Sequence, residues 1–150
     1  MLYDNFKDFI KALSTTGKIM AIDWGARRIG IALSDDRQEY AFPRDIIVGA
    51  DISARGRMYA PLHKLTQEEK AVGIVIGLPL LADGNDSETT KQVREFANQV
   101  AGQVQAPVGF VDESLTSHAA AEINKNSLDS VAAAITLEDA LAQIKRHRNV

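Results

Sequence analysis

Three acidic residues lie where apolar segments of the chain end or begin. Asp23 ends a short apolar run, Glu113 follows another, and Asp129 falls in the first turn of the last expected helix. If these ends meet at one edge of a sheet, the carboxylates converge, and such a cluster is costly without a cation because like charges repel. Oxygen-only ligands suit Mg²⁺ or Mn²⁺, and a pair of such ions supports phosphodiester hydrolysis. The pattern therefore favours a metal-dependent nuclease.

Each acid taken alone also has an ordinary structural explanation. An aspartate in the first turn of a helix, such as Asp129, is favoured by the helix dipole. Asp112 and Glu113 can simply begin a solvated loop after a strand. Asp23 is harder to explain in this way, because it ends an apolar strand beside a glycine turn. The metal hypothesis thus depends on the three acids meeting in space.

Basic and aromatic residues beside Asp23 are candidates for binding nucleic acid. Arg28, and Arg27 before it, could hold a phosphate through guanidinium N–H groups or could lie on a solvated hairpin. Trp24 could stack on an unpaired base, although packing in the core explains it equally well. A further basic run at Lys145–Arg148 would add to a nucleic-acid track only if the fold placed it beside the acids.

Composition limits the class of protein. The chain has 150 residues, no cysteine, and 17 Lys plus Arg against 20 Asp plus Glu, for a net charge of −3. The absence of cysteine excludes thiolate metal sites and disulfides, and the net charge argues against a globally basic surface for nucleic acid. The longest nearly apolar run, residues 71–82, is far shorter than the roughly 20 residues that span a bilayer. We therefore expect a cytoplasmic protein with no membrane partner.

The elements that must position these residues form one expected α/β domain over residues 1–150, with residues 1–17 as an N-terminal helical appendage. The expected strands cover residues 18–23, 28–34, 39–48, 71–76 and 107–111. The expected helices cover residues 88–103, 117–124 and 128–147, with Ser127 as the N-cap of the last, and a weaker helical stretch runs through Met58, Leu62 and Leu65. This order predicts a mixed five-stranded sheet with helices on both faces, and it resembles the ribonuclease H-like superfamily.

Four blocks of sequence, in order, resemble motifs of the YqgF family of pre-16S rRNA nucleases, which are also described as Holliday-junction-resolvase-like. The blocks are Ala21–Asp35, Ile74–Leu80 with Asp83 and Gly84, Val111–Thr116, and Asp129–Ala134. The similarity covers roughly residues 18–142.

The resemblance implies a set of functional residues and a substrate. Asp23, Glu113 and Asp129 match the acids of the family and would be the catalytic, metal-binding residues, with Mg²⁺ or Mn²⁺ as cofactor. Arg28 matches the first block and would bind phosphate. The implied activity is hydrolysis of RNA phosphodiester bonds in 5′-end maturation of pre-16S rRNA. The implied partners are pre-rRNA or structured nucleic acid and ribosomal particles, bound by a monomer or weak homodimer.

Two departures from the family pattern keep other functions open. Ser114 stands where the family usually has arginine, and residues 122–127 replace a longer, more basic loop. Both reduce positive charge where substrate is expected. The alternatives are a Holliday-junction resolvase, which needs a symmetric dimer, and a catalytically weak nucleic-acid-binding or ribosome-associated protein.

Overall fold

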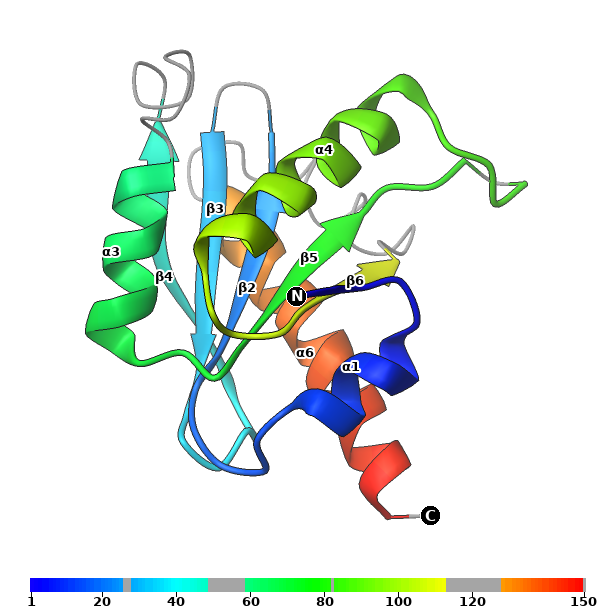
Figure 1. Cartoon of the computed structure of the whole chain (residues 1–150). Helices are drawn as coiled ribbons and strands as arrows, with labels where there is room; N and C mark the ends of the chain where they lie inside the picture. The colour runs from blue at the N-terminus through cyan, green and yellow to red at the C-terminus, as the bar shows by residue number, and fades with distance from the viewer. Residues whose placement is uncertain (26–27, 49–58, 82, 113–127, 150) are drawn as a thin grey trace.

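The protein is a six-stranded mixed sheet covered by helices on both faces (Figure 1). The computed structural model describes residues 1–25, 28–48, 59–81, 83–112 and 128–149. The strands are β1 (Leu2–Tyr3), β2 (Ile19–Trp24), β3 (Arg28–Ser34), β4 (Ala41–Val48), β5 (Gly73–Leu78) and β6 (Val108–Asp112). The helices in the described part of the chain are α1 (Phe6–Ala12), α3 (Tyr59–Glu69), α4 (Glu88–Gln103) and α6 (Leu128–Arg148).

The strands lie in the order β1-β6-β5-β2-β3-β4. The strands β2, β3 and β4 are antiparallel, whereas β5 pairs with β2 and β6 in parallel. The five predicted strands are all confirmed, but the predicted number is wrong by one. The sixth strand is β1, which pairs in parallel with β6.

The N-terminal segment contributes to the core as well as to the sheet. The predicted helix is present as α1, and its Phe9 is fully buried. Gly109 of β6 lies directly beneath this ring, since a Cβ atom at that position would come within 2.7 Å of the Phe9 Cγ atom. The segment expected to be an appendage is therefore packed into the domain. The division of residues 1–150 as a single domain stays a prediction.

The alternation of side chains along the strands divides the core into two layers. Met20 and Ile22 of β2 belong to the layer beneath α3 and α4, whereas Ile19 and Ala21 belong to the layer beneath α1 and α6. Helices therefore cover both faces of the sheet, as predicted. Residues 117–124, where a helix is expected, lie outside the described residues, as does Ser127.

The direction of α6 decides which residues it brings to each edge of the sheet. Its last residue, Arg148, donates hydrogen bonds to the carbonyl of Ser14, which precedes β2, and to Gln38, which follows β3. A helix of 21 residues is about 30 Å long. The beginning of α6 must therefore lie toward the opposite edge, where β2 ends (Figure 1).

The described helices include none with the length and apolar character that crossing a bilayer requires.

Replacing Phe9 by alanine tests whether the N-terminal segment is part of the folded core. We expect Phe9→Ala to lower the free energy of unfolding by about 3–5 kcal/mol, because it leaves a cavity between α1 and β6. Phe42→Ala is the matched control, since Phe42 is 54% exposed, and it should change stability by about 0.5 kcal/mol or less. Urea unfolding measures both. A loss for Phe9→Ala as small as that of the control would show that the segment is only an appendage.

Candidate active site

Asp23 lies one residue before the end of β2 and is half-buried. Ile19 and Ala21 face α6, so the alternation along the strand directs Asp23 to the same face. Its carboxylate is thus held by a buried strand at the edge toward which α6 begins. A carboxylate on a strand of this kind is well positioned for ligand binding, because its backbone cannot move freely.

Glycines flank Asp23 on both neighbouring strands. Gly30 of β3 is its direct antiparallel partner. On the other side, Ile22 pairs with Ile76 of the parallel strand β5. The next residues of the two strands, Asp23 and Gly77, therefore lie at the same level. Directly paired residues share a face of the sheet, so the positions level with Asp23 on both neighbouring strands lack a side chain. Both glycines are buried, so this part of the sheet belongs to the interior of the protein.

Arg28 shares the face of Asp23, whereas Trp24 does not. Ile29 belongs to the layer beneath α3 and α4, so Arg28, the exposed first residue of β3, is directed to the α6 face. Arg28 lies two positions beyond the partner of Asp23, a diagonal that a long side chain can cross. The sharp turn between them requires Gly25, because a Cβ atom there would approach the Arg28 carbonyl oxygen to 2.7 Å.

Trp24 packs on the opposite face of the sheet. Its ring lies 6.5 Å from the ring of Phe96 of α4, and its buried Nε1 finds no hydrogen-bond partner in the described part of the chain. Packing explains this position well, and stacking on a base stays a prediction. Arg27 lies outside the described residues.

The end of β6 provides a second acidic position at this edge. Asp112 pairs with Leu78, whose side chain belongs to the layer beneath α4, so Asp112 is directed away from the face of Asp23. Glu113 follows immediately in the sequence but lies outside the described residues. Asp112 is therefore unsuited to bind a cation together with Asp23.

Asp129 is the second residue of α6, in the turn where the helix dipole favours a carboxylate. The backbone thus carries Asp129 toward the edge at which β2 ends, and the side chain is not described. Among the described residues, no group of three or more His, Asp or Glu side chains is placed to hold a metal ion. Convergence of Asp23, Glu113 and Asp129 therefore stays a prediction.

Arg94 of α4 is a residue whose role at this edge the sequence did not reveal. Its guanidinium lies 5.5 Å from the centre of the Phe110 ring and donates hydrogen bonds of 2.8 and 3.2 Å to the Asp86 carboxylate. The hydrogen bond to Asp86 raises the pKa of Arg94, and the charges of Asp4 and Asp112 act in the same direction. Arg94 thus ties the loop after β5 to the strand that precedes Glu113.

Family comparison identifies relatives over most of the chain. A family model described as "RuvX: Holliday junction resolvase" matches residues 17–143. A protein of Maridesulfovibrio salexigens named "Putative pre-16S rRNA nuclease" is 40% identical over 136 residues, covering 84% of this chain and 98% of the relative. A protein of Rickettsia bellii with the same name is 33% identical over 156 residues, covering 97% and 99%.

Solved structures of similar fold include the RuvC protein of Thermus thermophilus. A structure titled as RuvC in complex with Holliday junction substrate matches with a TM-score of 0.57 at 13% identity, covering 85% of this chain and 94% of that chain. A second structure of the same protein matches with a TM-score of 0.54 at 11% identity. At this identity the similarity concerns the fold alone, and it confirms the predicted ribonuclease H-like architecture.

The Arg94–Asp86 ion pair can be measured by a double-mutant cycle. Both side chains are about one-third exposed, so we expect a coupling free energy of only about 0.5–1 kcal/mol from Arg94→Met, Asp86→Asn and the double variant. Urea unfolding measures the change in the free energy of unfolding for each of the three variants. Added salt should reduce the coupling. The exposed Lys64–Glu68 pair, at 3.9 Å, is the matched control and should show less coupling. Equal coupling in the two pairs would argue against a specific role for Arg94.

Proposed function

Because the chain belongs to the RuvX family, whose members are nucleases that hydrolyse phosphodiester bonds, we propose that it is a metal-dependent endonuclease acting on RNA. Its task would be 5′-end maturation of pre-16S rRNA in the cytoplasm, on ribosomal particles or their precursors. The names of the relatives that cover most of the chain support RNA as the substrate.

The observation that carries this proposal is the position of Asp23. The residue lies at the edge of the sheet where β2 ends, on the face covered by α6, with Gly30 opposite and Gly77 on the far side. Glycine at both directly neighbouring positions keeps other side chains of that level away from the carboxylate, which would favour the binding of a cation and a phosphate there. An acid that served only to end a strand would not need both neighbours to lack a side chain.

The proposed ligands of Mg²⁺ or Mn²⁺ are Asp23, Glu113 and Asp129. Carboxylate oxygens are the hard donors that these ions prefer, and the chain has no cysteine to favour a softer metal. Such ions, when bound, orient the attacking water and stabilise charge on the reacting phosphate. Asp23 would anchor them from the rigid sheet, and Asp129 would join from the first turn of α6.

Arg28 and its neighbours would position the substrate. A guanidinium on the face of Asp23 can donate two hydrogen bonds to a phosphate next to the cleaved bond. Arg27 would extend this contact. Trp24 lies on the opposite face of the sheet from Asp23, so the stacking proposed for it, on an unpaired base, would take place away from the reacting phosphate. Each of these roles acts on binding, so loss of Arg28 should raise KM more than it lowers kcat.

A Holliday-junction resolvase is the second candidate, favoured by the description of the family model. A resolvase presents two active sites to a four-way junction and therefore works as a symmetric dimer. The proposed RNA nuclease can act as a monomer or a weak homodimer. Cleavage of a pre-16S rRNA fragment and of a synthetic four-way DNA junction, compared at equal concentration, distinguishes the two substrates.

Substitution of the proposed ligands should abolish cleavage without unfolding the protein. We expect Asp23→Asn and Asp129→Asn each to reduce cleavage of the rRNA fragment by about 100-fold or more, because the metal and its charge stabilisation are lost. The matched controls are Asp36→Asn, exposed at the opposite edge, and Asp139→Asn, exposed on α6 about 15 Å from Asp129. Both controls should keep nearly full activity. Full activity of Asp23→Asn would exclude the proposed mechanism.

Metal binding should be visible as thermal stabilisation. A ligand that binds only the folded state raises its stability, by about 1.4 kcal/mol at ten times its Kd, which corresponds to roughly 3–6 °C in Tm for a domain of this size. We expect this shift with millimolar Mg²⁺ or Mn²⁺ in the wild type and its loss in Asp23→Asn. Removal of the metal by a chelator should reverse the shift. A wild-type Tm that does not respond would favour the catalytically weak nucleic-acid-binding protein.

A further inference from the structure

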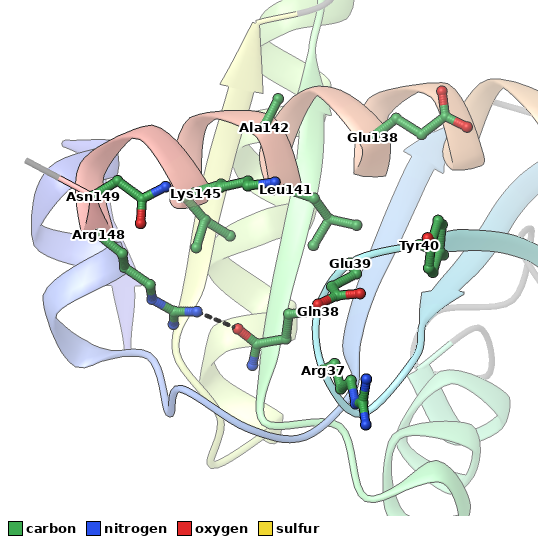
Figure 2. Close-up of a pocket in the computed structure, with 11 residues that line it drawn as sticks. Arg37, Gln38, Glu39, Tyr40, Glu138, Leu141, Ala142, Lys145, Arg148 and Asn149 are labelled. Carbon is green, nitrogen blue, oxygen red and sulfur yellow. Dashed lines mark hydrogen bonds between the residues drawn. The ribbon is translucent and has the colours of Figure 1, made fainter.

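A cavity of about 490 Å³ lies at the edge of the sheet opposite Asp23, between the last turns of α6 and the loop that joins β3 to β4 (Figure 2). Its volume is within the range that holds a small ligand. Leu141 and Ile144 line it on the side of the helix, and Gln38 and Tyr40 line it on the side of the loop. The family model ends at residue 143, before Ile144, Lys145 and Arg148 of this wall.

The loop that forms one wall is held in place by hydrogen bonds. The Asp35 carboxylate accepts hydrogen bonds from the backbone N–H groups of Glu39 and Tyr40, at 2.8 and 2.9 Å. These two bonds hold the pKa of Asp35 below its ordinary value. Gln38 adopts a positive φ of 60° and donates to the carbonyls of Ser14 and Gly17. The wall is therefore formed before any ligand binds.

The cavity is lined by three cations, Arg37, Lys145 and Arg148, and by two carboxylates, Glu39 and Glu138. None of the salt bridges among the described residues involves the three cations. Arg148 instead donates to two neutral oxygens, Gln38 Oε1 at 2.7 Å and the Ser14 carbonyl at 3.1 Å. Its remaining N–H groups are free of these bonds, so an anion entering the cavity would meet a positioned guanidinium.

Two of the cations, Lys145 and Arg148, lie toward one end of the cavity, and the aromatic ring lies toward the other. Figure 2 shows Arg148 and Lys145 toward one end and Tyr40 and Glu138 toward the other. Glu138 precedes Arg148 by ten residues on the helix, a separation of about 15 Å. Tyr40 is 65% exposed, and its ring offers a surface on which a flat base can stack. Carboxylates beside that ring can accept hydrogen bonds from an amino group of the base.

From this arrangement we propose that the cavity binds a nucleotide, with its phosphate at Lys145 and Arg148 and its base on Tyr40. Its source would be either a free nucleoside monophosphate or one residue of an RNA strand, since both present the same chemistry. The site lies about 30 Å from the beginning of α6 and needs no metal, so it does not depend on the proposed active site.

An NMR titration of the metal-free full chain with AMP tests the proposal. We expect amide shifts confined to residues 37–40 and 141–149, with Kd weakened at least about tenfold in Lys145→Ala and in Tyr40→Ala. The matched controls are Lys91→Ala, on the exposed face of α4, and Phe42→Ala, an exposed aromatic residue outside the cavity. Both should leave the Kd within about twofold of the wild type. Neither Lys145 nor Tyr40 belongs to the proposed active site.

Three further probes identify what the cavity recognises. Inorganic phosphate and adenosine should each bind more weakly than AMP, because each occupies one end only. An oligoadenylate that binds more tightly than AMP at the same residues would assign the site to an RNA strand, and one that binds more weakly would assign it to the free nucleotide. The proposal is overturned if AMP causes no shifts there, if the test variants bind as well as their controls, or if phosphate alone binds as tightly as AMP.

Discussion

The close packing of α6 on the sheet is the constraint on which the candidate active site and the proposed nucleotide cavity both depend. The contact surfaces are built from small residues, with Ala21 and Ala32 on the sheet and Ala133, Ala134 and Ala140 on the helix, all buried. Small side chains let the helix backbone approach the strands closely, and the larger Leu137 and Ile144 then fill the space beside them. Because the helix is a continuous element, its seating on the sheet determines the position of both its ends. One end carries the backbone of Asp129 toward the edge at which β2 ends, and the other closes the cavity against the loop after β3.

The glycines beside Asp23 show how the sheet accommodates a polar site at the edge of an apolar core. A glycine inside a strand costs about 0.5–1 kcal/mol, because it loses conformational freedom on folding and contributes no packing. Gly30 and Gly77 each fall within a strand. Both glycines lie on the face that α6 covers, where small residues also let the helix approach the sheet, and they place no side chain directly level with the Asp23 carboxylate.

The sequence predicted the elements well where a pattern extended over several residues. Five strands and the two long helices could be recognised from their apolar periodicity, because each buries a continuous face. The two-residue strand β1 could not, since it is too short to show any period and exists only through its pairing with β6. Proximity in sequence was also a poor guide to the site. Trp24 follows Asp23 directly, yet alternation places the two on opposite faces of the sheet.

The cavity at the end of α6 could not be predicted from the sequence, because it is formed by contacts between distant residues. Arg148 and Gln38 are 110 residues apart, and neither belongs to a local motif that would indicate a binding site. The basic run at the end of α6 could be read from the sequence, but its distance from the acids depends on the direction of the helix. In a chain with a net charge of −3, affinity for nucleic acid must come from cations that are not already paired. Lys18 and Arg44 are engaged with Glu69, and Arg94 is engaged with Asp86. Lys145 and Arg148 form no ion pair among the described residues, so a phosphate bound in the cavity would release their counterions, and its binding should weaken as salt is added.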